Sequence, residues 1–487
     1  MLSRRWLAIF LLLWISFSSA QFPCDTIGWT DRDRQFLGPA VRYLAYDTAR
    51  GFHAIYKTGY GEIRYNFRPK NGNWRWDEGV TVNPYQRNLG CLDYDITNGR
   101  ALIATDYLFK GRRLITLFID SACGAGRFEE TTIGPNLQFN LVAAARFGYP
   151  KFAAIRNESL YYYTQWSRRN LGPIGPFALH NIFASKISSR LGFVWTEYRT
   201  KKIYLRETPD GGGTWYGTRS LSDSVPSDCN RSLFGGCLTY DSVQPHLVCD
   251  LYDGENRGRV QLWHYCQYQE PNWSFITECT FADTSKLGFY TAALCRPSIG
   301  IDRRRFHSDF NRLYCVWEQF DPQNIDPRTN IARADIWAAA SFDNGRTWTE
   351  PLRLTQPDEA SKRFPYLAEV VDDTLHILYF ADQEAGSWEL GEGERRLNPV
   401  IYLRVPADIF IGQGINSPEE KNLSVAPGIP TILTGSFLNS LTGNFSLYDK
   451  SGRRVNLKNF ERLPAGVYFL QIPTTSGQRV KPIVKPK

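Results

Sequence analysis

The chain has 487 residues, of which 43% are hydrophobic and 14% aromatic, with 39 glycines and 27 prolines. This composition is typical of a folded protein rich in turns and excludes a disordered chain, and the length suffices for one large all-β domain followed by a smaller one. The formal net charge is +8 and the Lys and Arg residues are scattered, which argues against a nucleic-acid-binding surface.

The N-terminal segment MLSRRWLAIFLLLWISFSSA has the three parts of a secretory signal peptide. Arg4 and Arg5 are the positive region, an apolar stretch follows, and Ser18 to Ala20 form a small-residue cleavage site. We expect residues 1–20 to be a signal peptide, with a membrane anchor as the alternative reading. No later stretch is apolar for eighteen residues, so the sequence predicts no integral membrane span.

A repeated pair of strand-like runs organises the chain after the signal peptide. An apolar run, a tight turn and a second apolar run recur in seven units. The units begin at Val41, Cys91, Leu141, Phe183, Cys237, Arg296 and Arg363. From Asp47 to Asp372 six steps average about 54 residues, which suits the four-stranded blades of a β-propeller and is too long for most helical repeats.

Two copies of one eight-residue pattern follow the third strand of a unit, TPDGGGTW at 208–215 and SFDNGRTW at 341–348. In each copy the aspartate can accept hydrogen bonds from its own turn, the glycine can take a positive φ, and the tryptophan can enter the hydrophobic layer. We therefore interpret both as structural turns and not as catalytic signatures. The residues that define them are Thr208, Asp210, Gly212, Trp215, Ser341, Asp343, Gly345 and Trp348.

This pattern resembles the Asp-box, or BNR repeat, of sialidases and sialidase-like propellers. The phrases KRFPYLAEV, VWTEY and IYLRETPDGGGTW are similar to the blades of bacterial sialidase-like secreted proteins. That family most often has six blades, whereas seven units are counted here. We expect an all-β chain with a six- or seven-bladed propeller over residues 21–412, followed by a small C-terminal β-sandwich domain.

Residues 413–430 form a polar, Pro-rich linker, and residues 431–487 read as short alternating strands. The phrases LYDKSGRRV and LPAGVYFLQI, with the basic tail VKPIVKPK, are similar to the C-terminal sorting domain of the type IX secretion system. A fibronectin-like module is the alternative. The resemblance implies a bacterial protein that engages the type IX machinery and is secreted or held on the outer surface of a Gram-negative-type cell.

The resemblance also places a ligand pocket where first strands begin and second strands end. Three arginines at first-strand starts, Arg42, Arg296 and Arg363, are the expected ligand-binding residues. Five acids stand at second-strand ends: Asp106, Glu197, Asp250, Glu318 and Asp382. Asp106, Glu197 and Glu318 are the catalytic candidates, because arginines can clamp a carboxylate while a carboxylic acid protonates a glycosidic oxygen. Equally, acids recurring at equivalent blade positions can serve to cap strands or join blades.

The sequence departs from the sialidase pattern at the family signature, Phe/Tyr-Arg-Ile-Pro. The expected position reads Val41-Arg42-Tyr43-Leu44, which keeps the arginine but neither the isoleucine nor the proline. The tyrosine nucleophile cannot be assigned among 26 tyrosines. These departures favour a glycan- or surface-polymer-binding module, with a glycoside hydrolase of the exo-sialidase type acting on acidic sugars, or a protein-interaction scaffold, as alternatives.

The ten cysteines suit an exported protein in an oxidising compartment, and we expect disulfides in preference to a zinc site. No Cys-x-x-Cys pair occurs and the six histidines are dispersed, so the sequence predicts neither a metal nor a cofactor. We expect a monomer whose partners are a glycan or surface polymer and the secretion machinery.

Overall fold

The computed structural model describes sixteen stretches of the chain. They are residues 22–35, 41–59, 61–83, 90–109, 112–135, 138–143, 150–164, 167–175, 179–241, 244–302, 311–413, 415–416, 446–448, 453–455, 466–474 and 477–485. The expected signal peptide and most of the expected linker lie outside these ranges. The chain divides into two compact units, one comprising residues 1–408 with 415–417 and the other 409–414 with 418–487.

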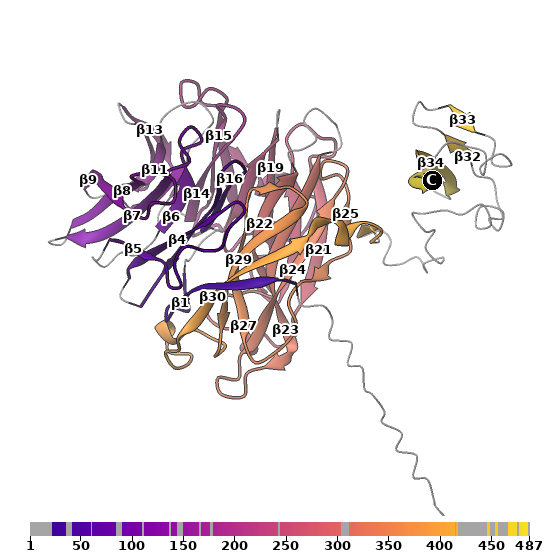
Figure 1. The fold of residues 1–487 in the computed structure, drawn as a ribbon. Helices are drawn as coiled ribbons and strands as arrows, with labels where there is room; N and C mark the ends of the chain where they lie inside the picture. Colours follow the sequence, from indigo (N-terminus) through magenta and orange to yellow (C-terminus); the bar gives the residue numbers. More distant parts are fainter. Residues whose placement is uncertain are drawn as a thin grey trace, which may run out of the picture. The chain divides into compact units, whose positions relative to one another are not determined.

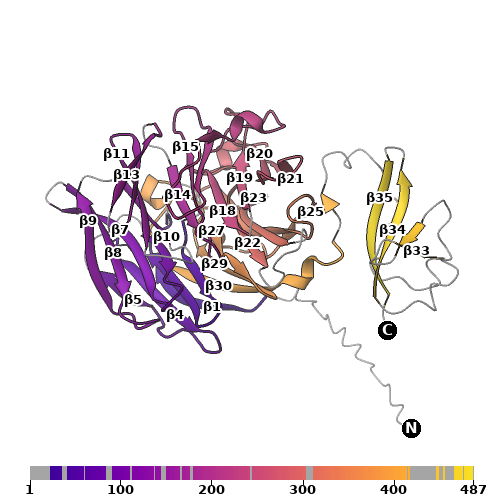
Figure 2. The same ribbon diagram turned by 90° about the horizontal axis from the view of Figure 1, so that it is seen from above.

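Unit one is a seven-bladed β-propeller, as the seven sequence units predict (Figures 1 and 2). Six blades are four-stranded antiparallel sheets, and the sixth blade carries one additional strand. The innermost strands are β2 (Leu44–Asp47), β6 (Gly90–Tyr94), β10 (Gln138–Ala143), β14 (Leu179–Ala184), β18 (Gly236–Tyr240), β22 (Leu294–Asp302) and β27 (Ser361–Leu367). The second strands are β3 (Gly51–Lys57), β7 (Ala101–Phe109), β11 (Lys151–Arg156), β15 (Leu191–Thr196), β19 (Pro245–Leu251), β23 (Arg312–Ile325) and β29 (Thr374–Asp382).

The outer half of each blade is built from two further strands. The third strands are β4 (Ile63–Pro69), β8 (Arg112–Asp120), β12 (Ser159–Tyr163), β16 (Ile203–Thr208), β20 (Arg259–Tyr265), β24 (Ala332–Ser341) and β30 (Asn398–Pro406). The outermost strands of the first six blades are β5 (Val80–Asn83), β9 (Phe128–Pro135), β13 (Arg168–Pro173), β17 (Arg219–Ser220), β21 (Trp273–Thr280) and β26 (Leu352–Arg353).

The ring closes through the N-terminal strand β1 (Cys24–Thr30), which is the outermost strand of the seventh blade. β1 pairs antiparallel with β30, from Cys24 opposite Leu403 to Thr30 opposite Asn398, and the two lie side by side in Figure 1. The N-terminal strand is thereby hydrogen-bonded into the last blade, where it covers the edge of β30, and the chain continues from β1 to the first blade.

Short elements complete the propeller. β28 (Val370–Val371) pairs parallel with β22, and β25 (Trp348–Thr349) pairs with β31 (Ile415–Asn416). The 3-10 turns are η1 (Ser222–Ser224), η2 (Thr284–Lys286), η3 (Trp388–Leu390) and η4 (Ala407–Phe410). None of the described helices is long and apolar enough to cross a membrane.

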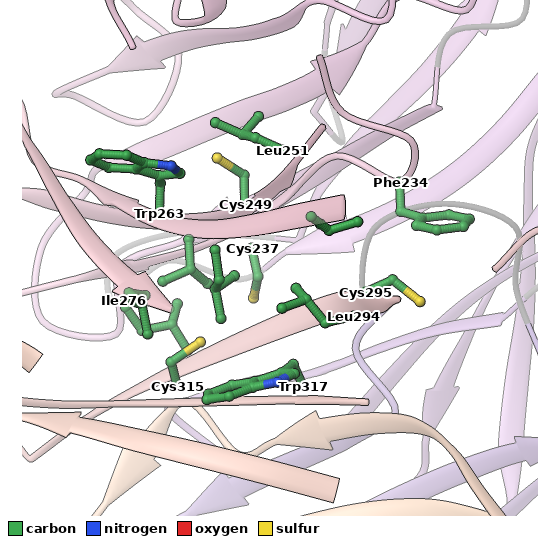
Figure 3. Packing of buried hydrophobic residues seen from close by; sticks show 14 of the residues in the cluster. Phe234, Cys237, Cys249, Leu251, Trp263, Ile276, Leu294, Cys295, Cys315 and Trp317 are labelled. Carbon is green, nitrogen blue, oxygen red and sulfur yellow. The ribbon is translucent and has the colours of Figure 1, made fainter. Parts of the chain in front are cut away.

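Buried strands fill the space between blades. Every residue of β15 and of β22 is buried, because a central strand packs neighbours on both of its faces. Three apolar clusters result, and the largest, drawn in part in Figure 3, joins blades four to six around Trp317 and Trp348, both wholly buried. This packing holds the inner strands rigidly enough to position a site between blades.

The cysteines depart from the expectation of disulfides, because all ten are free thiols. Cys237 lies opposite Val248 and Cys249 opposite Gly236, one register step apart, so their sulfur atoms point to opposite sides of the β18–β19 pair (Figure 3). Cys295 lies opposite Glu318, and Cys315 opposite Ile299, which separates that pair along the strands. The hairpin symmetry of the sequence therefore does not bring sulfur atoms together. All four thiols are buried in the core, and Cys295 donates a hydrogen bond to Glu318 at 3.0 Å.

The two eight-residue turns have one hydrogen-bond scheme. Ser341 Oγ donates to Asp343 at 2.8 Å and accepts from Gly345 N at 2.7 Å, while Thr347 N donates to Asp343 at 2.9 Å. The first turn repeats these bonds with Thr208, Asp210, Gly212 and Thr214 at 2.8 to 2.9 Å. Both aspartates are thus occupied within their own hairpins.

The described part of unit two is one antiparallel sheet in the order β33 (Arg454–Val455), β32 (Ser446–Tyr448), β34 (Gly466–Thr474), β35 (Gly477–Lys485). β34 and β35 form a hairpin that runs from Gly466 opposite Lys485 to Thr474 opposite Gly477. The rest of the region expected to form a β-sandwich lies outside the described residues.

Candidate functional site

A pocket opens between blades six and seven, on the side where their inner strands begin. The enclosed part of this pocket is small, about 10 Å³, and the space that opens to solvent around it brings the empty volume to about 340 Å³. The lining residues are Asp33, Arg34, Gly288, Phe289, Tyr290, Thr291, Arg296, Phe320, Ile331, Arg363, Phe364, Gly386, Ser387, Leu390 and Glu392. They come from inner strands of two blades, from the loop before β22, from the loop after β29 and from the segment after β1.

Two buried arginines share one buried carboxylate at this pocket. Arg296 forms an ion pair with one oxygen of Glu318, and Arg363 Nε lies 3.3 Å from the other. That second oxygen also accepts a hydrogen bond from Phe364 N at 2.7 Å. Burial by itself would raise the pKa of Glu318, but Arg363 and Arg296 outweigh it and lower the pKa to about 2. Glu318 is therefore ionised and interacts with both guanidinium groups.

The arginines are positioned by bulges that prolines impose on the inner strands. The register of β22 shifts between Cys295 and Ser298, and that of β27 between Arg363 and Tyr366. Pro297 and Pro365 lie in these gaps, and a proline has no N–H to donate to a ladder. Arg296 takes a φ of 56° and Phe364 one of 53°, a left-handed backbone that re-aims the neighbouring side chains.

Two carboxyl groups near Arg363 hold protons close to neutral pH. Burial raises the pKa of Asp33 to about 6, even though Trp388 N and Ser387 Oγ, the latter at 3.4 Å, donate to it. Burial and then the charge of Asp33 raise the pKa of Asp382 to about 7. Asp382 accepts from Asn398 Nδ2 at 3.0 Å, and its other oxygen has no hydrogen-bond partner among the described residues. A carboxylic acid in this range can donate a proton at neutral pH.

Two aromatic side chains stand at the mouth of the pocket. Phe289 is 58% exposed and Tyr290 is 51% exposed, although both belong to residue types that usually bury their rings. The carbonyl of Tyr290 accepts a hydrogen bond from Arg296 Nη2 at 2.6 Å. The aromatic loop and the arginine floor are therefore directly linked.

The structure brings together only part of the expected site. Arg296 and Arg363 line the pocket. Glu318 lies behind them in contact with both, and Asp382 interacts electrostatically with Arg363. Asp250 lies in the same interior, where it accepts from Ser232 Oγ at 3.3 Å and where burial raises its pKa to about 8. These four expected residues and Asp250 come from three successive blades, five to seven.

The remaining expected residues lie elsewhere. Arg42 does not line the pocket; its Nη1 lies 2.8 Å from Asp93, which also pairs with Lys186, in a buried cluster among the inner strands. Glu197 sits in the hairpin turn after β15 and accepts a hydrogen bond from Thr200. Asp106 is on β7, and its side chain lies outside the described residues.

Sequence reasoning missed Asp33, Phe289 and Tyr290 at this pocket. The spacing Arg-x-Pro occurs at Arg363-Phe364-Pro365, in the seventh blade, and not at Val41 to Leu44. A search for arginine shortly before proline in any first strand would have found it. Asp33 carried no such signal, because it reaches the pocket only through ring closure by β1. Within the described residues, no group of three or more His, Cys, Asp or Glu is placed to hold a metal ion.

No protein-family model and no curated protein matches this chain. Among solved structures, an ulvan lyase of polysaccharide lyase family PL25 is similar, with a TM-score of 0.48 and 10% identity over 81% of this chain and 98% of that one. A GH74 xyloglucanase from Xanthomonas campestris has a TM-score of 0.41 and 13% identity, covering 77% of this chain and 55% of that one. A Hadza microbial sialidase has a TM-score of 0.33 and 13% identity, covering 72% and 74%.

Proposed function

We propose that this propeller binds acidic glycans in the pocket between blades six and seven. The observation that carries the proposal is the pair of buried arginines, Arg296 and Arg363, that share the single carboxylate of Glu318. Two guanidinium groups at the base of a pocket favour an anionic ligand, and a planar guanidinium group can donate two parallel hydrogen bonds to a carboxylate or sulfate.

The residues that line the pocket favour a sugar as the molecule that carries the negative charge. Exposed aromatic rings at the mouth and charged groups below are the combination that holds a ring by stacking and by directed hydrogen bonds. Arg34 lies at the same wall, where it shares the carboxylate of Glu389 with Arg32, at 3.3 and 3.1 Å. Arg34 is more exposed than the two arginines at the base of the pocket. The recognition of the acidic group therefore falls to Arg296 and Arg363.

Calorimetric titration of the propeller with acidic and neutral oligosaccharides tests the proposal. Wild type is expected to bind sialylated or uronic-acid-containing oligosaccharides and not their neutral counterparts. Arg363→Ala should abolish this binding, whereas Arg259→Ala, which removes an arginine paired with Asp228 on blade five, should leave it intact. Equal binding of neutral and acidic sugars, or full binding by a folded Arg363→Ala variant, would contradict the proposal.

Glycoside hydrolysis is a second candidate, and Asp33 favours it. A carboxyl with a pKa of about 6 on the wall of a sugar pocket can protonate a leaving glycosidic oxygen. Assays with fluorogenic glycosides, sialosides included, test this activity. Turnover that Asp33→Asn removes while acidic-sugar binding persists would establish an enzyme, and absence of turnover by a protein that binds would leave a binding module.

We also propose that the protein is exported, as a bacterial protein addressed by residues 1–20 and 431–487. The support is the sequence pattern of these two segments. Fractionation of the producing cells, with mass spectrometry of the mature chain, tests it. Recovery of the full-length chain inside the cell would contradict export.

A further inference from the structure

The loop that carries Phe289 and Tyr290 has a tightly held backbone. Arg257 donates to the carbonyls of Gly288 and Leu287, each at 2.8 Å. Phe289 N donates to Glu392 Oε1 at 2.7 Å, and the Tyr290 carbonyl receives the 2.6 Å hydrogen bond from Arg296. Consecutive residues of this loop are thus fixed by charged side chains from the fifth, sixth and seventh blades.

The side chains of this loop are nevertheless turned outward. Tyr290 has a φ of 52°, a left-handed conformation that a bulky residue adopts at a cost in free energy. The exposed rings gain little from contacts with the core. Backbone strain combined with exposed aromatic rings indicates a surface shaped for a ligand.

The position of the two rings at the pocket distinguishes them from the other exposed apolar side chains. Trp29, Tyr198, Tyr216, Tyr268, Leu397 and Ile411 are also exposed among the described residues. Only Phe289 and Tyr290 of this described set line the pocket, and they are adjacent in the chain. Scattered single apolar residues need no functional explanation, whereas an adjacent pair at a pocket mouth does.

From this geometry we infer that Phe289 and Tyr290 form a second sugar subsite, which stacks against the ring attached to the acidic unit held by Arg296 and Arg363. This inference rests on the proposed function and deepens it. The occupant is a pyranose ring, because its C–H face is apolar while its edge is polar, and such a ring packs on an aromatic side chain. The ligand is therefore an acidic chain of at least two sugars, and not a single acidic monosaccharide.

The subsite also accounts for the link between loop and floor. Arg296 contacts Glu318 with one nitrogen and the Tyr290 carbonyl with another, so one guanidinium group links the backbone of the loop to the charged floor of the pocket.

Ligand length tests the inference. Calorimetry with wild type compares N-acetylneuraminic acid with 3′-sialyllactose, and galacturonic acid with trigalacturonate. For at least one pair the longer ligand is expected to bind wild type about tenfold or more tightly than its monosaccharide. In the Phe289→Ala, Tyr290→Ala double variant this ratio should fall to near one, while Tyr268→Ala, an exposed aromatic residue outside the pocket lining, should keep it.

The outcomes separate the two proposals. If wild type binds monosaccharide and oligosaccharide equally, or if the folded double variant keeps the length ratio, the second subsite is refuted while acidic-glycan binding stands. If wild type binds none of these four acidic ligands, both proposals fail. Melting temperatures of all variants show that the comparison is between folded proteins.

Discussion

Arg363 on the inner strand of blade seven lies with its Nε 3.3 Å from the carboxylate of Glu318 on the second strand of blade six. Both side chains are buried, with Glu318 fully so. The contact joins two blades by charge at the point where the candidate pocket has its base. Stability and ligand recognition are therefore linked through the same carboxylate.

Replacement of Glu318 by Gln should destabilise the protein strongly. The neutral amide would leave Arg296 and Arg363 buried without their shared counter-charge, and breaking a buried ion pair in this way costs about 3–5 kcal/mol. Urea unfolding followed by tryptophan fluorescence measures the change. The matched variant Glu394→Gln removes a carboxylate that is 75% exposed and should change stability by less than about 0.5 kcal/mol. Equal, small effects would show that the buried trio is not a stability determinant.

Binding of acidic sugars should strengthen as the pH falls from 7.5 to 5. Asp33, with a pKa of about 6, is ionised above that pH and neutral below it, so acid removes a negative charge from the pocket wall. Asp382, with a pKa of about 7, changes in the same direction, whereas Arg363 stays charged. We expect roughly a tenfold gain in affinity.

The variant Asp33→Asn isolates the contribution of that one carboxyl. It should bind more tightly than wild type at pH 7.5 and show a flatter pH profile, because its amide oxygen can still accept from Trp388 N without carrying charge. Titration calorimetry at four pH values measures both. A wild-type profile that rises with pH would contradict the role of Asp33.

Asp250 should make the protein less stable as the pH rises from about 4 to about 8. Its pKa is raised to about 8 in the folded state, so the folded chain keeps a proton that the unfolded chain releases above its usual value of 3.8. The stability that this proton supplies is complete below pH 4 and declines up to pH 8. Asp250→Asn should therefore gain stability relative to wild type over this window in thermal melts. Glu255→Gln, on an exposed hairpin, should show no comparable trend.

The hydroxyl groups of the two eight-residue turns should contribute to stability independently. Ser341→Ala leaves the buried Gly345 N without its 2.7 Å acceptor, and Thr208→Val does the same to Gly212 N at 2.9 Å. Each change should cost about 1–3 kcal/mol, and the double variant should show the sum because the turns lie in different blades. Neither should alter ligand affinity. The exposed Thr97→Val serves as the control in the same denaturation series.

Gly345→Ala should be the most damaging small substitution in these turns. Gly345 has a φ of 88°, and a Cβ there would lie 2.2 Å from Cε1 of His264. His264 is fully buried and held by His246 at 3.1 Å and Ser274 at 3.0 Å, so it cannot move aside. We expect a loss of about 3 kcal/mol. Gly217→Ala, which meets no atom within 4 Å, should be nearly neutral.

The repeat and the turns were accessible from sequence because they are local. Each blade has its own pattern of apolar runs and turns, and Ser341, Asp343, Gly345 and Thr347 form hydrogen bonds among themselves. The seven runs that begin between Val41 and Arg363 predicted six or seven blades, and the structure has seven. Arg296 and Arg363 could also be chosen from the sequence as ligand-binding candidates, because each lies near the start of a first strand. Arg42 met the same criterion, so the sequence did not distinguish it from them.

Local pattern thus determined the all-β class, the seven units and the structural role of the two turns. Only the tertiary structure decided which groups meet, because closure of the ring by Cys24–Thr30 carries Asp33 across more than three hundred positions to Ser387 and Trp388. The same applies to the cysteines, whose separation depends on strand register, and to Arg42, which the inner strands direct to Asp93. Contacts of this kind depend on how blades pack against one another. The order of residues along the chain does not give the distances between residues of different blades.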